Sequence, residues 1–176
     1  MSNLATTDVA IAGDGRNLSL SFVVAGDPQA QYRTKSNWKA RKVAKFYDPS
    51  CIAKADWKQD LRKALADCGV TKFPFFGKEH TDIDQAEGLY IDIEFYILRC
   101  KKDYKKVKGV DVLKDEYQKY PGKKDTDNMI KFVMDAAHTV LYDDDKCVCK
   151  ISAVKKFVSE DEKKRGPYTK IFITTM

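Results

Sequence analysis

The sequence predicts an α+β fold, a single domain in which a mixed β-sheet of about four strands carries two main helices on one face. Three observations lead to this prediction. The chain has 176 residues, the size of one domain, and 43% of them are hydrophobic, which is enough for a normal core. Segments with strand and helix periods follow in the order strand, helix, strand, helix, strand, strand. No internal repeat interrupts that order.

The first half of the chain contains a predicted tail, two strands and a helix. Residues 1–17, rich in Gly, Asp, Asn and Thr, are assigned to a flexible tail, and residues 18–176 to the domain. Leu18 to Val24 alternate as a strand does, and a Gly-Asp-Pro turn ends it. A basic loop and a short strand at Phe46-Tyr47 precede a helix that runs from the N-cap Ser50 to about Cys68.

The second half contributes the remaining strands and a second helix. Residues 90–98 alternate strictly and form the clearest strand. Residues 99–120 hold many lysines and have no clean period, so we expect this insertion to leave the core. A helix is predicted from about Asp125 to about His138, followed by a turn at an aspartate triplet. Strands at 148–154 and 168–173 complete the sheet, the last as a closing hairpin.

The composition excludes several classes of protein. The apolar runs are too short to cross a bilayer, and the N-terminus lacks the pattern of a secretory signal. Five cysteines, an odd number without a CxxC spacing, argue against a disulfide framework and a zinc site. Phosphate-binding loops, dinucleotide fingerprints and HExxH motifs are absent. We therefore expect an intracellular protein of a reducing compartment, with no membrane partner.

Basic residues are concentrated in one segment. The chain carries a net charge of +6, and residues 99–124 contain ten basic residues against four acids, the same excess. Interleaved tyrosines suit phosphate contacts with base stacking, although a charged run is also typical of a solvated loop. The candidate DNA-binding residues are Arg33 and Lys35 in the first basic loop, then Lys101, Lys102, Lys105, Lys106, Lys123 and Lys124.

Acidic residues stand at both ends of the second predicted helix. Asp125 and Asp127 lie at its start, where free N–H groups and the helix dipole favour ionised carboxylates that can bind a hard cation. Asp144 and Asp145 belong to the triplet after the helix. Caps and turns explain these aspartates as well, and Lys131 could simply pair with Asp127 at i, i+4. The sequence does not establish whether the triplet folds back to the start of the helix.

The spacing of these residues resembles a known signature. The segment KKDTDNMIKFVMDAAHTVLYDDDKCV is similar to that of RusA-type Holliday junction resolvases, in which a D-x-D-N-x-x-K-x-x-x-D-A helix precedes D-D-x-x-V. A weaker similarity covers the first strand, Arg33, Tyr47-Asp48-Pro49 and the first helix. The tail, residues 70–88 and the lysine-rich insertion are extra relative to a compact member. The matching residues are Asp125, Asp127, Asn128, Lys131, Asp135, Ala136, Asp144, Asp145 and Val148.

The resemblance implies a RusA-like nuclease domain over residues 18–176, with the insertion at about 99–120. It implies a homodimeric, metal-dependent endodeoxyribonuclease, a crossover junction resolvase that hydrolyses phosphodiester bonds in opposed strands of a four-way junction in branched DNA. By the same resemblance, Asp125, Asp127 and Asp145 bind Mg²⁺, for which Mn²⁺ could substitute. Lys131 is then the catalytic lysine, and Asp144 competes with Asp145 as the third acid.

Two other functions remain open at this point. One is a less selective nuclease that cuts flaps, forks or other branched DNA. The other is a non-catalytic nucleic-acid-binding module whose acids are only caps and turn formers. The set Asp125, Asp127, Lys131 and Asp145 argues against the module, because a protein that only binds DNA gains nothing from acids near phosphates.

Overall fold

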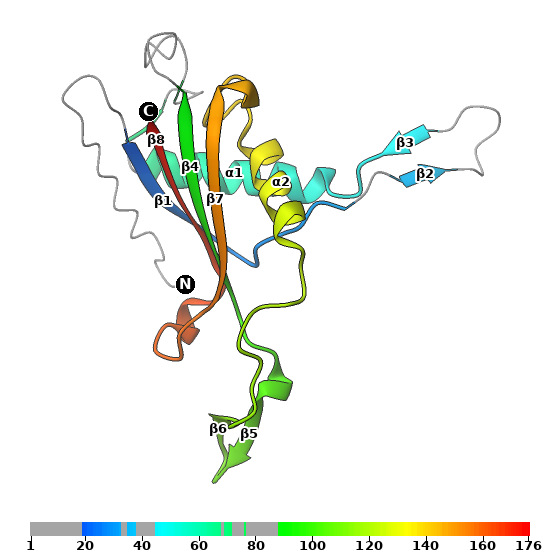
Figure 1. The fold of residues 1–176 in the computed structure, drawn as a ribbon, viewed down its shortest axis with the longest axis vertical. Helices are drawn as coiled ribbons and strands as arrows, with labels where there is room; N and C mark the ends of the chain where they lie inside the picture. Colours follow the sequence, from blue (N-terminus) through cyan, green and yellow to red (C-terminus); the bar gives the residue numbers. More distant parts are fainter. Residues whose placement is uncertain (1–18, 33–34, 38–44, 68, 72–75, 77–87) are drawn as a thin grey trace.

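A four-stranded mixed sheet with two helices forms the body of the protein (Figure 1). The computed structural model describes residues 19–32, 35–37, 45–67, 69–71, 76 and 88–176, with only the backbone described at 35–37 and 45–47. This architecture confirms the predicted α+β fold. The predicted tail at 1–17 lies outside the described residues.

The strands of the sheet follow in the order β1, β8, β4, β7: Ser19–Ala25, Tyr168–Thr175, Leu89–Ile97 and Val148–Phe157. β8 is antiparallel to both of its neighbours, whereas β4 and β7 are parallel. The predicted closing hairpin is therefore wrong. β7 runs parallel to β4, so the chain returns along the other side of β4 and inserts β8 between β1 and β4. β7 is left at an edge of the sheet.

One face of the sheet carries both helices and the core. Alternate residues of β1, β4 and β8 are buried on this face, and α1 (Cys51–Asp67) and α2 (Thr126–Ala137) pack against them. Trp57 of α1 meets Phe132 of α2 edge-on, with ring centroids 6.3 Å apart. Neither these helices nor any other described helix has the length and apolar character needed to cross a membrane.

Two pairs of short antiparallel strands project from the body (Figure 1). β2 (Lys35–Asn37) pairs with β3 (Lys45–Tyr47), which confirms the predicted short strand at Phe46-Tyr47. In the lysine-rich segment, β5 (Tyr104–Val107) pairs with β6 (Val110–Leu113). Lys108 and Gly109 join them with positive φ angles of 50° and 82°, as a two-residue hairpin turn requires. Short 3₁₀ helices occupy Lys101–Asp103, Asp145–Cys147 and Lys163–Arg165.

The contact between Trp57 and Phe132 leads to a first testable prediction. We expect Phe132→Ala to lower the free energy of unfolding by about 3–5 kcal/mol, because the side chain is buried against Trp57 and the surrounding core collapses only partly. Ile52→Ala on α1, where the side chain is 73% exposed, is the control and should cost less than about 0.5 kcal/mol. Urea unfolding followed by circular dichroism measures both. Equal losses would contradict this packing.

Candidate active site

The N-terminal turn of α2 presents two exposed acids. Asp125 occupies the N-cap position, but its side chain accepts no capping hydrogen bond from the helix. One carboxylate oxygen accepts a long bond of 3.4 Å from Nδ2 of Asn128. Asp127 follows in the first turn. Capping therefore accounts for the backbone position of Asp125 and not for its carboxylate, which remains able to bind a cation.

The backbone that leads into α2 is held from two sides. Nζ of Lys124 donates to Oδ2 of Asp27 at 2.7 Å, and this ion pair joins the start of α2 to the loop after β1. On the other side, Nζ of Lys155 in β7 donates to the carbonyl oxygen of Lys124 at 2.7 Å. These contacts fix the backbone at the start of α2, where Asp125 and Asp127 lie. Lys124, one of the candidate DNA-binding residues, already has a structural partner in Asp27.

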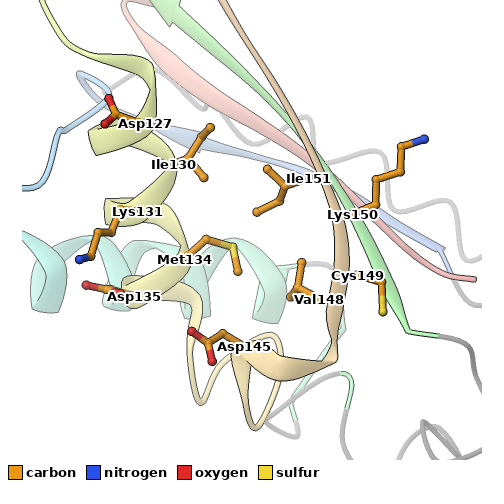
Figure 2. Close-up of a pocket in the computed structure, with 10 residues that line it drawn as sticks. All are labelled: Asp127, Ile130, Lys131, Met134, Asp135, Asp145, Val148, Cys149, Lys150 and Ile151. Carbon is orange, nitrogen blue, oxygen red and sulfur yellow. The ribbon is translucent and has the colours of Figure 1, made fainter.

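A groove of about 540 Å³ lies between α2 and the edge strand β7 (Figure 2). Apolar side chains from both elements face each other across it, among them Ile130 and Ile151. Charged side chains stand along the helix and at the turn before β7. The groove is lined by Asp127, Ile130, Lys131, Met134, Asp135, Asp145, Val148, Cys149, Lys150 and Ile151.

Lys131 is the exposed cation on the helix side of this groove. An i, i+4 pair with Asp127 was the ordinary explanation for its position. In the part of the chain that the structure describes, however, no carboxylate lies within ion-pairing distance of its ammonium group. Lys131 therefore has no direct ionic partner among the described residues, and its side chain extends along the side of α2 that points away from β7 (Figure 2).

The aspartate triplet divides between a cap and the groove. Oδ1 of Asp144 accepts a hydrogen bond of 3.1 Å from the N–H of Lys146 and caps the 3₁₀ helix Asp145–Cys147. This backbone hydrogen bond is the main reason why the pKa of Asp144 is lowered. Asp145 lines the groove, whereas Asp144 does not. Between the two registers that the sequence left open, the geometry favours Asp145.

Buried groups fix the far end of α2. The hydroxyl of Tyr142 donates to the carbonyl oxygen of Met134 at 2.9 Å, and burial raises its pKa, so it remains a donor. Burial also raises the pKa of Cys147 to about 11. Its thiol, with Sγ 2.8 Å from the carbonyl oxygen of Asp144, is therefore neutral and hydrogen-bonded rather than a thiolate ligand.

The acids of one chain do not meet at one point. Asp127 lies in the first turn of α2 and Asp145 lies beyond its last turn (Figure 2), and a helix of 12 residues is about 18 Å long. Among the described residues, no three His, Cys, Asp or Glu side chains form a group that could hold a metal ion. Carboxylates are the donors that Mg²⁺ prefers. A single chain, as far as it is described, does not gather three of them.

The lysine-rich hairpin is anchored at its base. The guanidinium of Arg99 lies between two aromatic rings, 3.9 Å from the centroid of Phe157 and 4.7 Å from that of Tyr117. The hydroxyl of Tyr104 donates to Glu160 at 2.6 Å. These contacts join the hairpin to β7 and to the loop after it. The hairpin therefore leaves the body in a fixed direction.

The candidate DNA-binding residues differ in what surrounds them. Lys101, Lys102 and Lys123 are exposed. Lys105 and Lys106 are also exposed and form surface ion pairs with Asp115 at 3.5 Å and Asp111 at 2.9 Å. Such exposed pairs contribute little and exchange readily for a phosphate partner. Arg33 lies outside the described residues, and so does the side chain of Lys35.

The sequence of this chain matches one protein-family model over most of its length. The family model described as Endodeoxyribonuclease RusA matches residues 25–173. The chain belongs to the RusA endodeoxyribonuclease family. This result confirms the family that the sequence signature indicated, and it supports a nuclease activity. A search of curated proteins found no match.

The RusA match spans all the elements that build the groove, and also the β5–β6 hairpin.

Sequence analysis did not identify two residues that position these elements. Arg99 belonged to a basic run and gave no sign of its aromatic partners. Lys54 on α1 contacts Asp135 on α2 across 81 positions of sequence, a separation at which no local pattern signals a pair.

The contacts of Arg99 at the base of the hairpin lead to a second testable prediction. We expect Arg99→Ala to speed amide hydrogen exchange in β5 and β6 by about tenfold, because each cation–π contact contributes about 0.5–2 kcal/mol. Global stability should fall much less. Lys101→Ala, which removes an exposed charge from the same segment, is the control. Unchanged exchange in the Arg99 variant would show that other contacts hold the hairpin.

Proposed function

We propose that this RusA-family chain is a Mg²⁺-dependent endodeoxyribonuclease that resolves four-way DNA junctions by hydrolysing phosphodiester bonds in opposed strands. The observation that carries the proposal is the groove beside α2, where Lys131, without an ionic partner among the described residues, stands between the acids Asp127 and Asp145. A binding module would not benefit from acids there, because they repel phosphate unless a cation intervenes.

The groove residues suit distinct roles in this reaction. Asp125, Asp127 and Asp145 would hold Mg²⁺, or Mn²⁺ in its place. When bound, the ion would activate a water molecule and neutralise charge on the phosphate. Lys131 would donate hydrogen bonds to a phosphate oxygen and stabilise the negative charge that develops during hydrolysis.

The basic residues would hold the DNA backbone without reading its sequence. Lys101, Lys102, Lys105 and Lys106 stand on or next to the anchored hairpin, and Lys123 lies just before α2. Lys35 belongs to β2, and we propose the same role for Lys35 and for Arg33, which lies outside the described residues. Binding of this kind weakens steeply with salt, because each phosphate contact releases counterions.

We extend the proposal to a homodimer in which each chain completes the acid set of the other. In a two-fold dimer with antiparallel α2 helices, the start of one helix lies beside the end of its partner. Asp125 and Asp127 of one chain would then approach the partner's Asp145, whereas the described residues of one chain form no group of three possible metal ligands. Exposed Ile151 and the half-buried Met134 line the groove beside the edge strand β7 and offer apolar surface for such a contact.

Substrate choice provides the third prediction. With Mg²⁺, we expect cleavage of a labelled synthetic four-way junction at least about tenfold faster than cleavage of linear duplex or of a flap. EDTA should abolish cleavage, and Mn²⁺ should restore it. Product lengths on a sequencing gel then show whether opposed strands are cut.

The outcomes separate the competing functions. Equal cutting of junction, flap and duplex would leave a nuclease but remove the claim of junction resolution. Junction binding without cleavage of any substrate, at any concentration of Mg²⁺ or Mn²⁺, would favour the binding module.

Complementation between inactive variants is the fourth prediction. Asp125→Asn and Asp145→Asn homodimers should bind junctions but not cut them. A mixed dimer of the two should regain nicking of one strand, because one of its two sites combines an intact Asp125 with the partner's intact Asp145. Mixing Asp125→Asn with Asp127→Asn is the control and should restore nothing. A mixed dimer as inactive as its parents would mean that all three acids act within one chain.

A further inference from the structure

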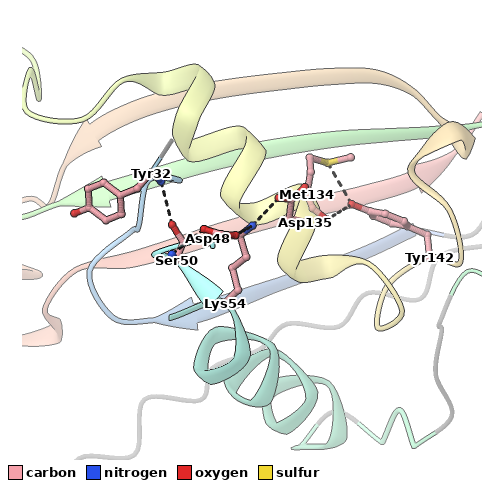
Figure 3. A network of polar contacts seen from close by, with 7 residues as sticks. All are labelled: Tyr32, Asp48, Ser50, Lys54, Met134, Asp135 and Tyr142. Atoms are coloured by element: carbon pink, nitrogen blue, oxygen red, sulfur yellow. Dashed lines mark hydrogen bonds and ion pairs between the residues drawn. The ribbon is translucent and has the colours of Figure 1, made fainter. Parts of the chain in front are cut away.

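Lys54 joins two acids from different parts of the fold. Its side chain is 16% exposed, and Nζ lies 2.7 Å from Oδ2 of Asp48 and 2.7 Å from Oδ2 of Asp135 (Figure 3). Asp48 precedes α1 and is itself fixed, since its Oδ1 accepts the N–H of Ser50 at 2.8 Å. Asp135 stands on α2. One ammonium group therefore holds the carboxylate of Asp135 from outside its own helix.

The contact shifts the pKa values of Lys54 and Asp48 in the directions expected of an ion pair. Burial acts to lower the pKa of Lys54, but hydrogen bonds to Asp135 and Asp48 outweigh it, and the pKa is raised. The hydrogen bond from Lys54 is also the main cause of the lowered pKa of Asp48. These shifts favour the charged forms of Lys54 and Asp48. Partial burial distinguishes this arrangement from the exposed ion pairs of the hairpin.

Asp135 is also a neighbour of Lys131. Residues four apart lie on the same face of a helix, so Asp127, Lys131 and Asp135 form one charged stripe along the groove. A Lys–Asp pair at i, i+4 is ordinary on a helix surface. Here Asp135 pairs with Lys54 instead, and Lys131 has no carboxylate within ion-pairing distance among the described residues.

We propose that Lys54 is a positioning residue that holds Asp135 away from Lys131 and so keeps Lys131 available for a phosphate of the DNA. The role of Lys131 in this inference rests on the proposed nuclease function. Without Lys54, Asp135 would lose its partner, and the nearest cation on its own helix would be Lys131. The groove would also gain an uncompensated negative charge. Both effects weaken the hold on a phosphate.

A double-variant experiment tests this role. Single-turnover junction cleavage is compared for wild type, Lys54→Met, Asp135→Asn and Lys54→Met/Asp135→Asn. We expect Lys54→Met to slow cleavage by about tenfold or more, and the double variant to recover to within about threefold of wild type, since the amide cannot capture Lys131 by charge. Lys58→Met removes a lysine one turn further along α1 that bonds only to Oγ1 of Thr139 in the described contacts, and should leave the rate unchanged.

A second measurement does not depend on cleavage. An amine-reactive acetylating reagent labels Lys131 at a rate that mass spectrometry can follow peptide by peptide. Labelling should slow in Lys54→Met and recover in the double variant, because a lysine paired with a carboxylate is held protonated. If Lys54 only linked α1 to α2, both variants would be less stable and the labelling of Lys131 would be unchanged.

The results separate this inference from the proposed function. If a folded double variant cleaves as slowly as Lys54→Met and labelling does not recover, Lys54 acts only as a tie between helices and the inference is wrong. If wild type does not cut DNA but labelling follows the expected pattern, the nuclease proposal fails and the control of Lys131 by Lys54 stands. If Lys54→Met does not fold, the double variant is compared with Asp135→Asn, and a difference above about tenfold in cleavage overturns the inference.

Discussion

The packing of α2 against α1 and the sheet determines where every charged side chain of the groove lies. With 3.6 residues per turn, burial of one side of this helix directs the residues between the buried ones to the opposite side. Asp127, Lys131 and Asp135 are such residues, and their spacing of four places them in one stripe. Rotating α2 would bury these charges, so core packing and charge placement are linked. The buried side consists of Met129, Phe132, Val133, Ala136 and Ala137.

The charges of this protein act on DNA in opposite directions at long range and close to α2. The chain as a whole carries +6, and a net positive field attracts DNA from a distance. Close to the groove, Asp125, Asp127 and Asp145 repel a phosphate, and a bound cation would reverse the sign of that local interaction. Under the proposed function, attraction at long range and repulsion at short range would make cleavage depend on an ion, whereas binding would depend chiefly on the lysines. This separation is the physical reason to measure the two properties independently.

The sequence predicted the elements better than their arrangement. Alternation identified the strands at 90–98 and 148–154, and the helical period identified α2 almost to its ends. The β5–β6 hairpin was not recognised, because each strand has only four residues and lysine and valine share one face of the pair. Partners far apart in sequence, such as Lys54 and Asp135, depend on how α1 and α2 pack. For the same reason the place of Asp145 relative to Asp125 could not be derived locally.

The edge strand β7 contacts both the start of α2 and the base of the β5–β6 hairpin. Its register with β4 shifts at one point. The pairing with β4 shifts between Leu89 and Tyr90, where β7 has an extra residue. Gly88 permits this shift, because its φ is +128° and a Cβ there would lie 2.1 Å from Sγ of Cys149. Beyond the shift, Ile151 faces the groove, Lys155 reaches the carbonyl oxygen of Lys124, and Phe157 stacks on Arg99. A slip by one residue would turn all three side chains to the other face of the sheet. A single bulge thus aligns the groove, the first turn of α2 and the base of the lysine-rich hairpin on one strand.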